Sequence, residues 1–144
     1  MSQLAPSLTS RLTDLLSPAR VIEDTTSLAA CEVDARSPSA ILQPDSVAEI
    51  AEILRFASAE RLAVIPMAGR THLGIGMPPR RYDLALDLSR MNRILAYEPR
   101  DLTLGIEPGV TCSDLNRELA LVAFGIILPV GRSAVVIEIG RAHV

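Results

Sequence analysis

The chain has 144 residues, 49% of them hydrophobic, which suffices for one core and is too short for two ordinary domains. A net charge of −3 and an aromatic content of 3% argue against nucleic-acid binding, which relies on basic surfaces and stacking rings. No apolar run reaches the roughly 18 residues that span a bilayer, and the N-terminus lacks the basic-then-apolar order of a signal peptide. We therefore expect a soluble cytoplasmic protein that binds a small molecule, although a partner can still hold it at a membrane.

The two cysteines carry no metal or disulfide pattern. Cys31 and Cys112 lie far apart and belong to no CxxC or Cys/His motif. We interpret both as buried free thiols and expect no metal site.

Residues 1–36 are predicted to form a helix and a linker. Leucines recur at roughly helical spacing before the Ser-Pro pair at 17–18, which ends the helix. We expect this helix to pack on the outside of the domain. The polar stretch 21–40 is predicted to be mostly loop, with weak strand character at 20–22.

A strand, a helix and a second strand follow. Residues 40–43 are a short apolar strand, and Ser46 stands three residues before Glu49, which is the spacing of a capping box. The helix is predicted to run to about residue 60, and residues 62–65 form the next strand, parallel to the first in one sheet. The expected buried face of the helix is Val47, Ile50, Ala51, Leu54 and Ala57, and its solvent face carries Glu49, Glu52 and Arg55.

The glycine-rich loop after this strand is the candidate binding element. It holds Gly69, Gly74 and Gly76 among polar residues. Glycine lets a ligand approach the backbone, and successive exposed amides form an anion-binding nest that suits a phosphate group. The alternative is that the glycines only make turns, which is the commoner role of such loops.

Two known phosphate motifs do not fit this loop. A Walker loop needs Gly-Lys-Ser/Thr before a helix, whereas Gly69 is followed by Arg-Thr-His. A Rossmann fingerprint needs a third glycine and then a helix, but Pro79 occupies that position. The remaining hypothesis is a loop between two strands that binds phosphate through its backbone amides.

The rest of the chain is predicted to form three strands, a helix and one more strand. Residues 83–88 alternate, with Leu84, Leu86 and Leu88 on one side, which predicts a half-buried strand. Residues 93–98 and 102–107 form a hairpin with a turn at Pro99-Arg100-Asp101. Its inward side chains are expected to be Leu102, Leu104 and Ile106.

The last helix follows a second capping box, formed by Thr111 and Asp114. It is predicted to run to about Phe124 and to stop at Gly125, with a strand at 126–128. Its expected buried side chains are Leu115, Leu119 and Val122.

Four motifs occur in an order that is more specific than any one of them. They are Pro-Asp-Ser at 44–46 before a helix, Ala-Val-Ile-Pro at 63–66 before the glycine loop, Leu-Asp-Leu-Ser-Arg-Met-Asn at 86–92, and Ile-Glu-Pro-Gly-Val-Thr at 106–111 before a helix. Over about residues 38–130 this order resembles the first half of the PCMH-type FAD-binding domain, the flavin domain of the vanillyl-alcohol oxidase family. The segment 73–81, LGIGMPPRR, is most similar to the FAD-binding subunit of glycolate oxidase, a relative of D-lactate dehydrogenase.

The resemblance implies an α+β fold, with a small mixed sheet flanked by helices, over residues 37–130, and FAD as the cofactor. In that family the glycine loop wraps the pyrophosphate through backbone N–H groups, with a threonine hydroxyl beside them. The corresponding residues of this chain are Met67, Ala68, Gly69, Arg70, Thr71 and His72. A second set, expected along the ADP or isoalloxazine side, is Pro108, Gly109, Val110 and Thr111.

Three residues of the loop depart from the family pattern. Ala68 and Arg70 stand where glycine is common, and a β-carbon at positive φ costs roughly 1 kcal/mol, which would distort the loop or weaken binding. Alternatively, Arg70 contacts a phosphate oxygen and offsets that cost. His72 sits one place beyond the histidine that attaches FAD covalently in some relatives, and we interpret it as exposed or phosphate-facing.

By resemblance, the chain is part of an FAD-dependent oxidoreductase acting on a 2-hydroxy acid such as glycolate or D-lactate, with other dehydrogenase subunits as possible partners. We expect it to be inactive alone, because the family's second flavin-binding half and substrate domain are absent from this sequence. Asp87 and Glu107 receive no acid–base role, since no base or nucleophile is paired with them. The alternatives are a non-catalytic FAD-binding electron-relay subunit and a truncated product that binds nothing.

The tail at 131–144 is expected to be non-native. Residues 139–144, IGRAHV, are what the codons ATC GGA AGA GCA CAC GTC encode, and this string resembles sequencing-adapter DNA.

Overall fold

The computed structural model describes residues 6–98 and 103–122, and the chain divides into two compact units, residues 1–90 and 91–144. Length alone predicts one core, but the strands fall into two separate sheets, so each unit has its own strand pairing. The domain boundaries expected at residues 36 and 130 stay predictions. Within the described ranges, no helix has both the length and the apolar character needed to cross a membrane.

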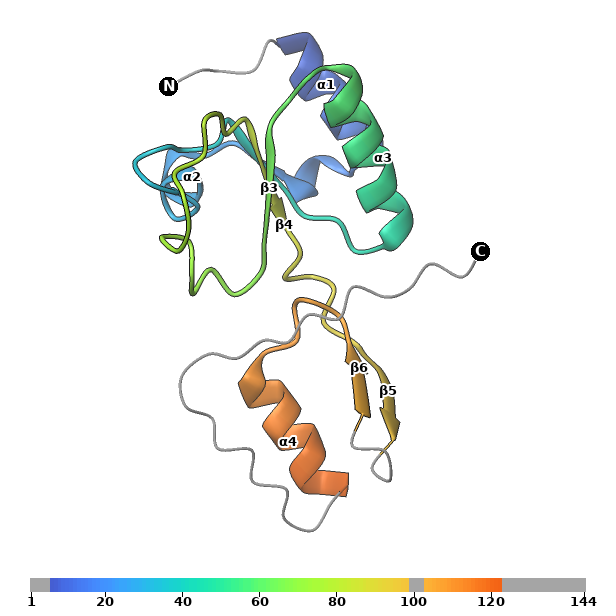
Figure 1. The fold of residues 1–144 in the computed structure, drawn as a ribbon. Coiled ribbons are helices and arrows are strands. Elements are labelled where there is room, and N and C mark those ends of the chain that lie inside the picture. Colours follow the sequence, from blue (N-terminus) through green and yellow to red (C-terminus); the bar gives the residue numbers. More distant parts are fainter. Residues whose placement is uncertain (1–5, 99–102, 123–144) are drawn as a thin grey trace. The chain divides into compact units, whose positions relative to one another are not determined.

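The first unit is built on a four-stranded sheet in the order β1-β2-β4-β3, and Figure 1 labels two of its neighbouring strands, β3 and β4. The strands are β1 (Val21–Ile22), β2 (Ala40–Leu42), β3 (Val64–Met67) and β4 (Leu84–Asp87). Both β2 and β3 run parallel to β4, and β1 is antiparallel to β2. The predicted parallel arrangement of β2 and β3 is therefore confirmed, with β4 between them.

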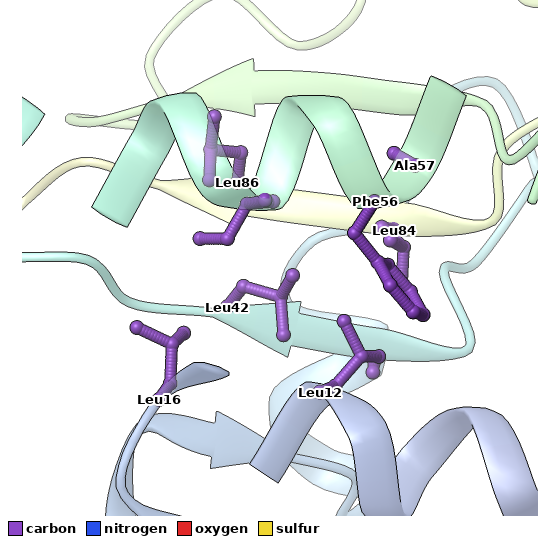
Figure 2. Packing of buried hydrophobic residues seen from close by; sticks show 9 residues of the cluster. Leu12, Leu16, Leu42, Phe56, Ala57, Leu84 and Leu86 are labelled. Carbon is purple, nitrogen blue, oxygen red and sulfur yellow. The ribbon is translucent and has the colours of Figure 1, made fainter. Parts of the chain in front are cut away.

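Two helices pack on one face of this sheet, α1 (Pro6–Leu15) and α3 (Val47–Ala59). Figure 2 shows leucines of β2 and β4 directed toward side chains from both helices. The buried residues of this cluster are Leu12, Leu16, Ala40, Leu42, Ile53, Phe56, Ala57, Leu84 and Leu86. This core positions the parallel strands whose carboxyl ends carry the candidate site.

Strand β4 is buried on both faces, so the prediction of a half-buried strand was wrong. Leu84 and Leu86 face the helical cluster, while Ala85 belongs to a second buried cluster with Cys31, Met67 and Tyr82. A central strand flanked by two parallel neighbours and covered on each face cannot present a polar side to water. The short side chain of Ala85 therefore belongs to a core.

The buried face of α3 also differs from the prediction. Ile53 and Phe56 are buried together with Ala57, whereas Val47 is 73% and Leu54 46% exposed. Apolar residues occupy more than one stripe of this helix, so periodicity alone does not choose which stripe meets the sheet. Ile50 and Ala51 are partly buried.

The capping box of α3 is only half formed. Ser46 Oγ accepts a hydrogen bond from the Glu49 backbone N–H at 3.3 Å, as predicted. The Glu49 carboxylate accepts from the backbone N–H of Asp45 at 2.9 Å and pairs with Arg20 at 2.6 Å. Glu49 therefore ties the helix to the segment before β1 instead of facing water.

Three further details differ from or extend the sequence analysis. The short helix α2 (Thr25–Ala29) lies in the stretch expected to be loop, and Asp24 caps it by accepting from the Ser27 N–H at 2.9 Å. A 3₁₀ turn, η1 (Pro18–Arg20), precedes β1. Strand β3 begins two residues later than predicted, because the Leu62 N–H still bonds the Ala57 carbonyl at 2.8 Å.

The second unit contains an antiparallel hairpin, β5 (Ile94–Glu98) with β6 (Thr103–Ile106), followed by α4 (Cys112–Val122). Both predicted strands and the start of the helix are confirmed, and Leu104, Ile106 and Leu115 are partly buried. Several predictions fall outside the described residues or side chains: the turn at 99–101, Leu102, Leu119, Val122, the helix end at 124–125, the strand at 126–128 and the tail at 131–144.

Candidate functional site

Polar side chains gather where the parallel strands of the first unit end. Gln43 directly follows β2, Asp87 is the last residue of β4, and Arg70 lies in the loop after β3. Parallel strands place their carboxyl ends at one edge of a sheet, and ligands of such sheets bind at that edge. The glycine loop therefore lies where the topology favours a binding site.

The buried carboxylate of Asp87 joins three segments at this edge. Its side chain is 1% exposed. Its Oδ2 accepts hydrogen bonds from Gln43 Nε2 at 3.0 Å and Arg70 Nη2 at 2.7 Å, and Oδ1 accepts from the Ser89 backbone N–H at 3.1 Å. Burial raises the pKa of Asp87, but the donors from Gln43, Ser89 and Arg70 outweigh it, so the pKa lies below its ordinary value. Asp87 is a carboxylate anchor for the loop.

Arg70 adopts the left-handed backbone conformation, with φ +54°. Positive φ was predicted at Ala68 and Arg70, which stand where the family commonly has glycine, and the structure confirms it at Arg70. Ala68 is not among the described non-glycine residues with positive φ. The left-handed conformation costs an L-residue roughly 1–2 kcal/mol. The ion pair with Asp87 offsets part of this cost, and a contact of Arg70 with phosphate stays a prediction.

The backbone N–H groups of residues 68–72 are available to a ligand. Among the described residues, no backbone carbonyl accepts a hydrogen bond from them. Both ends of the loop are held: the Met67 carbonyl accepts from the Leu88 N–H at 2.8 Å, and the His72 carbonyl accepts from the Ile75 N–H at 3.1 Å. A run of unused amides between two fixed ends is the chemistry of an anion nest.

Side chains of the loop add one polar pair at its surface. Thr71 Oγ1 and His72 Nδ1 lie 2.9 Å apart, and both residues are exposed. The threonine hydroxyl that the resemblance places beside the pyrophosphate is therefore on the open side of the loop. Arg80 and Arg81 are exposed, and Arg81 pairs with Asp83 at 2.7 Å.

In the second predicted segment, residues 108–111, two backbone N–H groups are used within the protein. The Gly109 N–H donates to the Met91 carbonyl at 2.7 Å, and the Val110 N–H donates to the Glu107 carbonyl at 3.1 Å. Thr111 Oγ1 caps α4 by accepting from the Asp114 N–H at 3.0 Å. This segment can offer a ligand a surface, but not a run of free donors.

Glu107, beside this segment, is a structural carboxylate. It is 5% exposed and accepts from the Arg93 backbone N–H at 2.8 Å and from Arg93 Nη2 at 2.6 Å. These hydrogen bonds from Arg93 hold the pKa of Glu107 below its ordinary value, although burial opposes them. The contacts close the open end of the β5–β6 hairpin.

The two predicted binding segments belong to different units of the chain, residues 67–72 to the first and 108–111 to the second. Sequence reasoning missed Gln43 and the anchoring role of Asp87. One signal was present, since each residue stands at the end of an apolar strand and parallel strands share an edge. Cys31 is buried, Cys112 is partly buried, and both are free thiols. The described residues hold no group of three or more His, Cys, Asp or Glu suited to a metal ion.

Comparison with known proteins gives a family and a fold. Residues 38–136 match the FAD binding domain family. The chain is 32% identical over 117 residues to a D-2-hydroxyglutarate dehydrogenase of Stutzerimonas stutzeri, covering 78% of this chain and 25% of that protein. It is 34% identical over 80 residues to the glycolate oxidase subunit GlcD of Bacillus subtilis, covering 56% and 17%.

Among solved structures, p-cresol methylhydroxylase with bound substrate superposes with a TM-score of 0.72 at 20% identity, over 81% of this chain and 24% of that one. This likeness concerns the fold. The chain thus spans about a quarter or less of the length of these three proteins.

Proposed function

Because this chain belongs to the family of FAD binding domains, we propose that it holds FAD, with the diphosphate on the loop of residues 67–72. The match confirms the resemblance to PCMH-type FAD-binding domains and the α+β fold that it implied. The site residues are our proposal, and they are Met67, Ala68, Gly69, Arg70, Thr71 and His72.

The unused amides of residues 68–72 are the observation that carries this proposal. A diphosphate presents several anionic oxygens, each of which accepts hydrogen bonds, and backbone N–H groups satisfy them without a lysine. Gly69 is exposed and the space around it is open, since a β-carbon there would meet only Thr71 Cγ2, at 3.9 Å. The Arg70 side chain is 33% exposed beside Asp87 and adds positive charge to the loop. The residues present therefore fit the group.

Residues 108–111 have a different part in this proposal. The N–H groups of Gly109 and Val110 are used internally and Pro108 has none, so we propose that Pro108, Gly109, Val110 and Thr111 line the ADP or isoalloxazine side mainly by contact. Gly109 carries no side chain there, which permits the ring system or the nucleoside to lie against the backbone.

The reaction class we propose is oxidation of a 2-hydroxy acid. Two relatives are named for such acids, D-2-hydroxyglutarate and glycolate, and D-lactate is a third of the same chemistry. The flavin supplies the redox chemistry when bound, while this chain binds and orients it. No described side chain is assigned to the acid, so we propose that the chain alone is inactive and that residues outside it complete the substrate site.

Other dehydrogenase subunits are the proposed partners, because one relative is named as a subunit of glycolate oxidase. Co-purification from the native host with a second dehydrogenase polypeptide is the expected result. A chain that elutes alone under mild conditions, loaded with FAD, would count against a stable partner.

The proposed function is tested by adding FAD to the purified chain, removing free flavin by gel filtration and recording the absorbance. Retention of a flavin band at about 450 nm is expected, as for any flavoprotein. In a version lengthened along its native gene, anaerobic D-2-hydroxyglutarate, glycolate or D-lactate should bleach that band. Absence of the band from both versions would overturn the assignment, and bleaching by none of the three acids would overturn the substrate class.

A further inference from the structure

The Arg70–Asp87 ion pair connects the interior of the sheet to the exposed loop. Arg70 Nη2 lies 2.7 Å from Asp87 Oδ2, and Asp87 is held in turn by Gln43 and by the Ser89 N–H. The carboxylate therefore has one fixed position. Arg70 is the residue through which the loop reaches it.

This contact gives Arg70 a compensating interaction at a backbone conformation that local sterics disfavour. At φ +54° the β-carbon of Arg70 crowds the backbone, and a glycine would adopt the same angle without cost. An arginine released from Asp87 would relax toward a right-handed or extended conformation. Such a change reverses the direction of neighbouring N–H groups, so it would disperse the amides of residues 68–72.

Charge adds a second consequence of the same pair. Asp87 is an anion beneath the loop, and an anion repels a diphosphate at short range. Arg70 neutralises it where the loop begins to turn. The pair thus leaves no uncompensated negative charge of Asp87 beside the loop.

We propose that Asp87 is a positioning residue for the FAD diphosphate: by holding the Arg70 guanidinium, it keeps Arg70 left-handed and keeps the N–H groups of residues 68–72 in one anion-binding arrangement. This inference rests on the proposed function, since the anion is the diphosphate of FAD. At position 70, a buried aspartate and an arginine together hold the left-handed backbone conformation that a glycine would adopt without an anchor.

The first test measures FAD affinity by quenching of flavin fluorescence, in the whole chain, for four variants. Asp87→Asn preserves shape but releases Arg70, and we expect about tenfold weaker binding. Adding Arg70→Gly to Asp87→Asn should restore affinity to within about threefold, because glycine needs no anchor. Arg70→Ala with Asp87→Asn makes the same charge change but keeps a β-carbon, and it should stay weak. Arg81→Gln, which breaks an exposed ion pair of the same 2.7 Å length, should leave affinity unchanged.

The second test needs no flavin. Trypsin cleaves after arginine, and the tether should protect the Arg70–Thr71 bond. We expect Asp87→Asn to speed cleavage there about tenfold, while cleavage after the exposed Arg80 keeps its rate. Equal protection at Arg70 in a folded Asp87→Asn chain would overturn the tether.

The outcomes separate this inference from the proposed function. Failure of the unaltered chain to bind FAD removes the proposed function and, with it, the diphosphate role of Asp87. Binding of FAD by both the unaltered chain and a folded Asp87→Asn chain with equal affinity overturns this inference alone. Should Asp87→Asn fail to fold, Arg70→Gly is compared with Arg70→Ala against intact Asp87, and equal affinities of these two would overturn the inference.

Discussion

The loop at 67–72 and the segment at 108–111 were both predicted to contact FAD, yet they use their backbone in opposite ways. The first leaves the N–H groups of residues 68–72 unused, whereas the second donates from Gly109 to Met91 and from Val110 to Glu107. Each lies beside a buried carboxylate paired with an arginine. Asp87 reaches outward to a loop, while Glu107 closes the hairpin on which it stands.

The difference shows that a buried carboxylate at a strand end does not identify a ligand site. Asp87 and Glu107 share burial, an arginine partner and a lowered pKa. The two carboxylates differ in whether the neighbouring backbone has several N–H groups that make no hydrogen bond to another backbone group. The first segment has backbone donors that can bind an anion, whereas the second can contact a ligand mainly through its surface.

The largest expected effect is on the free energy of unfolding, when a leucine is shortened in the strand next to each segment. Leu86→Ala, in the core under the first loop, should lower the free energy of unfolding by about 2–5 kcal/mol, because a fully enclosed leucine leaves a cavity. Leu104→Ala, on the half-buried hairpin strand, should cost less. Urea unfolding of the two variants gives the comparison. Equal losses would mean that both segments rest on equally packed cores.

The next effect concerns charge at the loop. Gly69→Asp should weaken FAD binding by about a hundredfold, since a carboxylate within about 5 Å of a diphosphate opposes it by roughly 3 kcal/mol at an effective dielectric constant near 20. Gly69→Asn, its uncharged counterpart, should lose far less, because the site has room for a side chain. Fluorescence titration with FAD measures both. Equal affinities for the two variants would move the diphosphate away from this loop.

A smaller effect is expected at Thr111, whose hydroxyl caps α4. Thr111→Ala should reduce stability by about 1 kcal/mol, and Thr111→Ser should restore most of it, because serine caps equally well. FAD affinity should change little if the segment contributes only a surface. If Thr111→Ala loses much FAD affinity and Thr111→Ser regains it, the hydroxyl is a cofactor ligand. The second segment would then bind FAD through a polar group, contrary to the proposed difference between the two segments.

The smallest effect appears only in acid. The folded-state pKa of Asp87 is lowered, so the stability from its ionised form is fully present above the unfolded pKa of about 4 and is lost as pH falls through the folded value. The stability difference between the unaltered chain and Asp87→Asn should therefore stay constant from pH 7 to about pH 5 and shrink in stronger acid. Urea midpoints across this range measure it, and Glu107→Gln should behave alike. A difference that grows in acid would contradict the ionised anchor.

Sequence signals were reliable where they are local. The caps at Ser46 and Thr111 depend on residues three positions apart, and each strand was recognised from a short run of neighbouring residues. The parallel arrangement of β2 and β3 followed from the strand–helix–strand order. The positive φ of Arg70 was also foreseeable, because an arginine replaced the expected glycine.

What the sequence could not show depends on contacts between distant segments. Gln43 meets Asp87 across 44 positions, and Arg70 meets it across 17. The stripe of α3 that meets the sheet is chosen by packing with α1 and β4, so Ile53 and Phe56 replaced Val47 and Leu54 in the core. Which amides stay unused is likewise settled by the folded backbone, and that is the property on which the candidate site depends.

The most direct test of the central claim compares FAD with riboflavin, which has the same ring system but no diphosphate. The purified chain is titrated with each under identical conditions, and ADP is added as a competitor. We predict that FAD binds, that riboflavin binds far more weakly, and that ADP displaces FAD, because the amides of residues 68–72 recognise the diphosphate. Riboflavin binding as tight as FAD binding, with no displacement by ADP, would contradict the account.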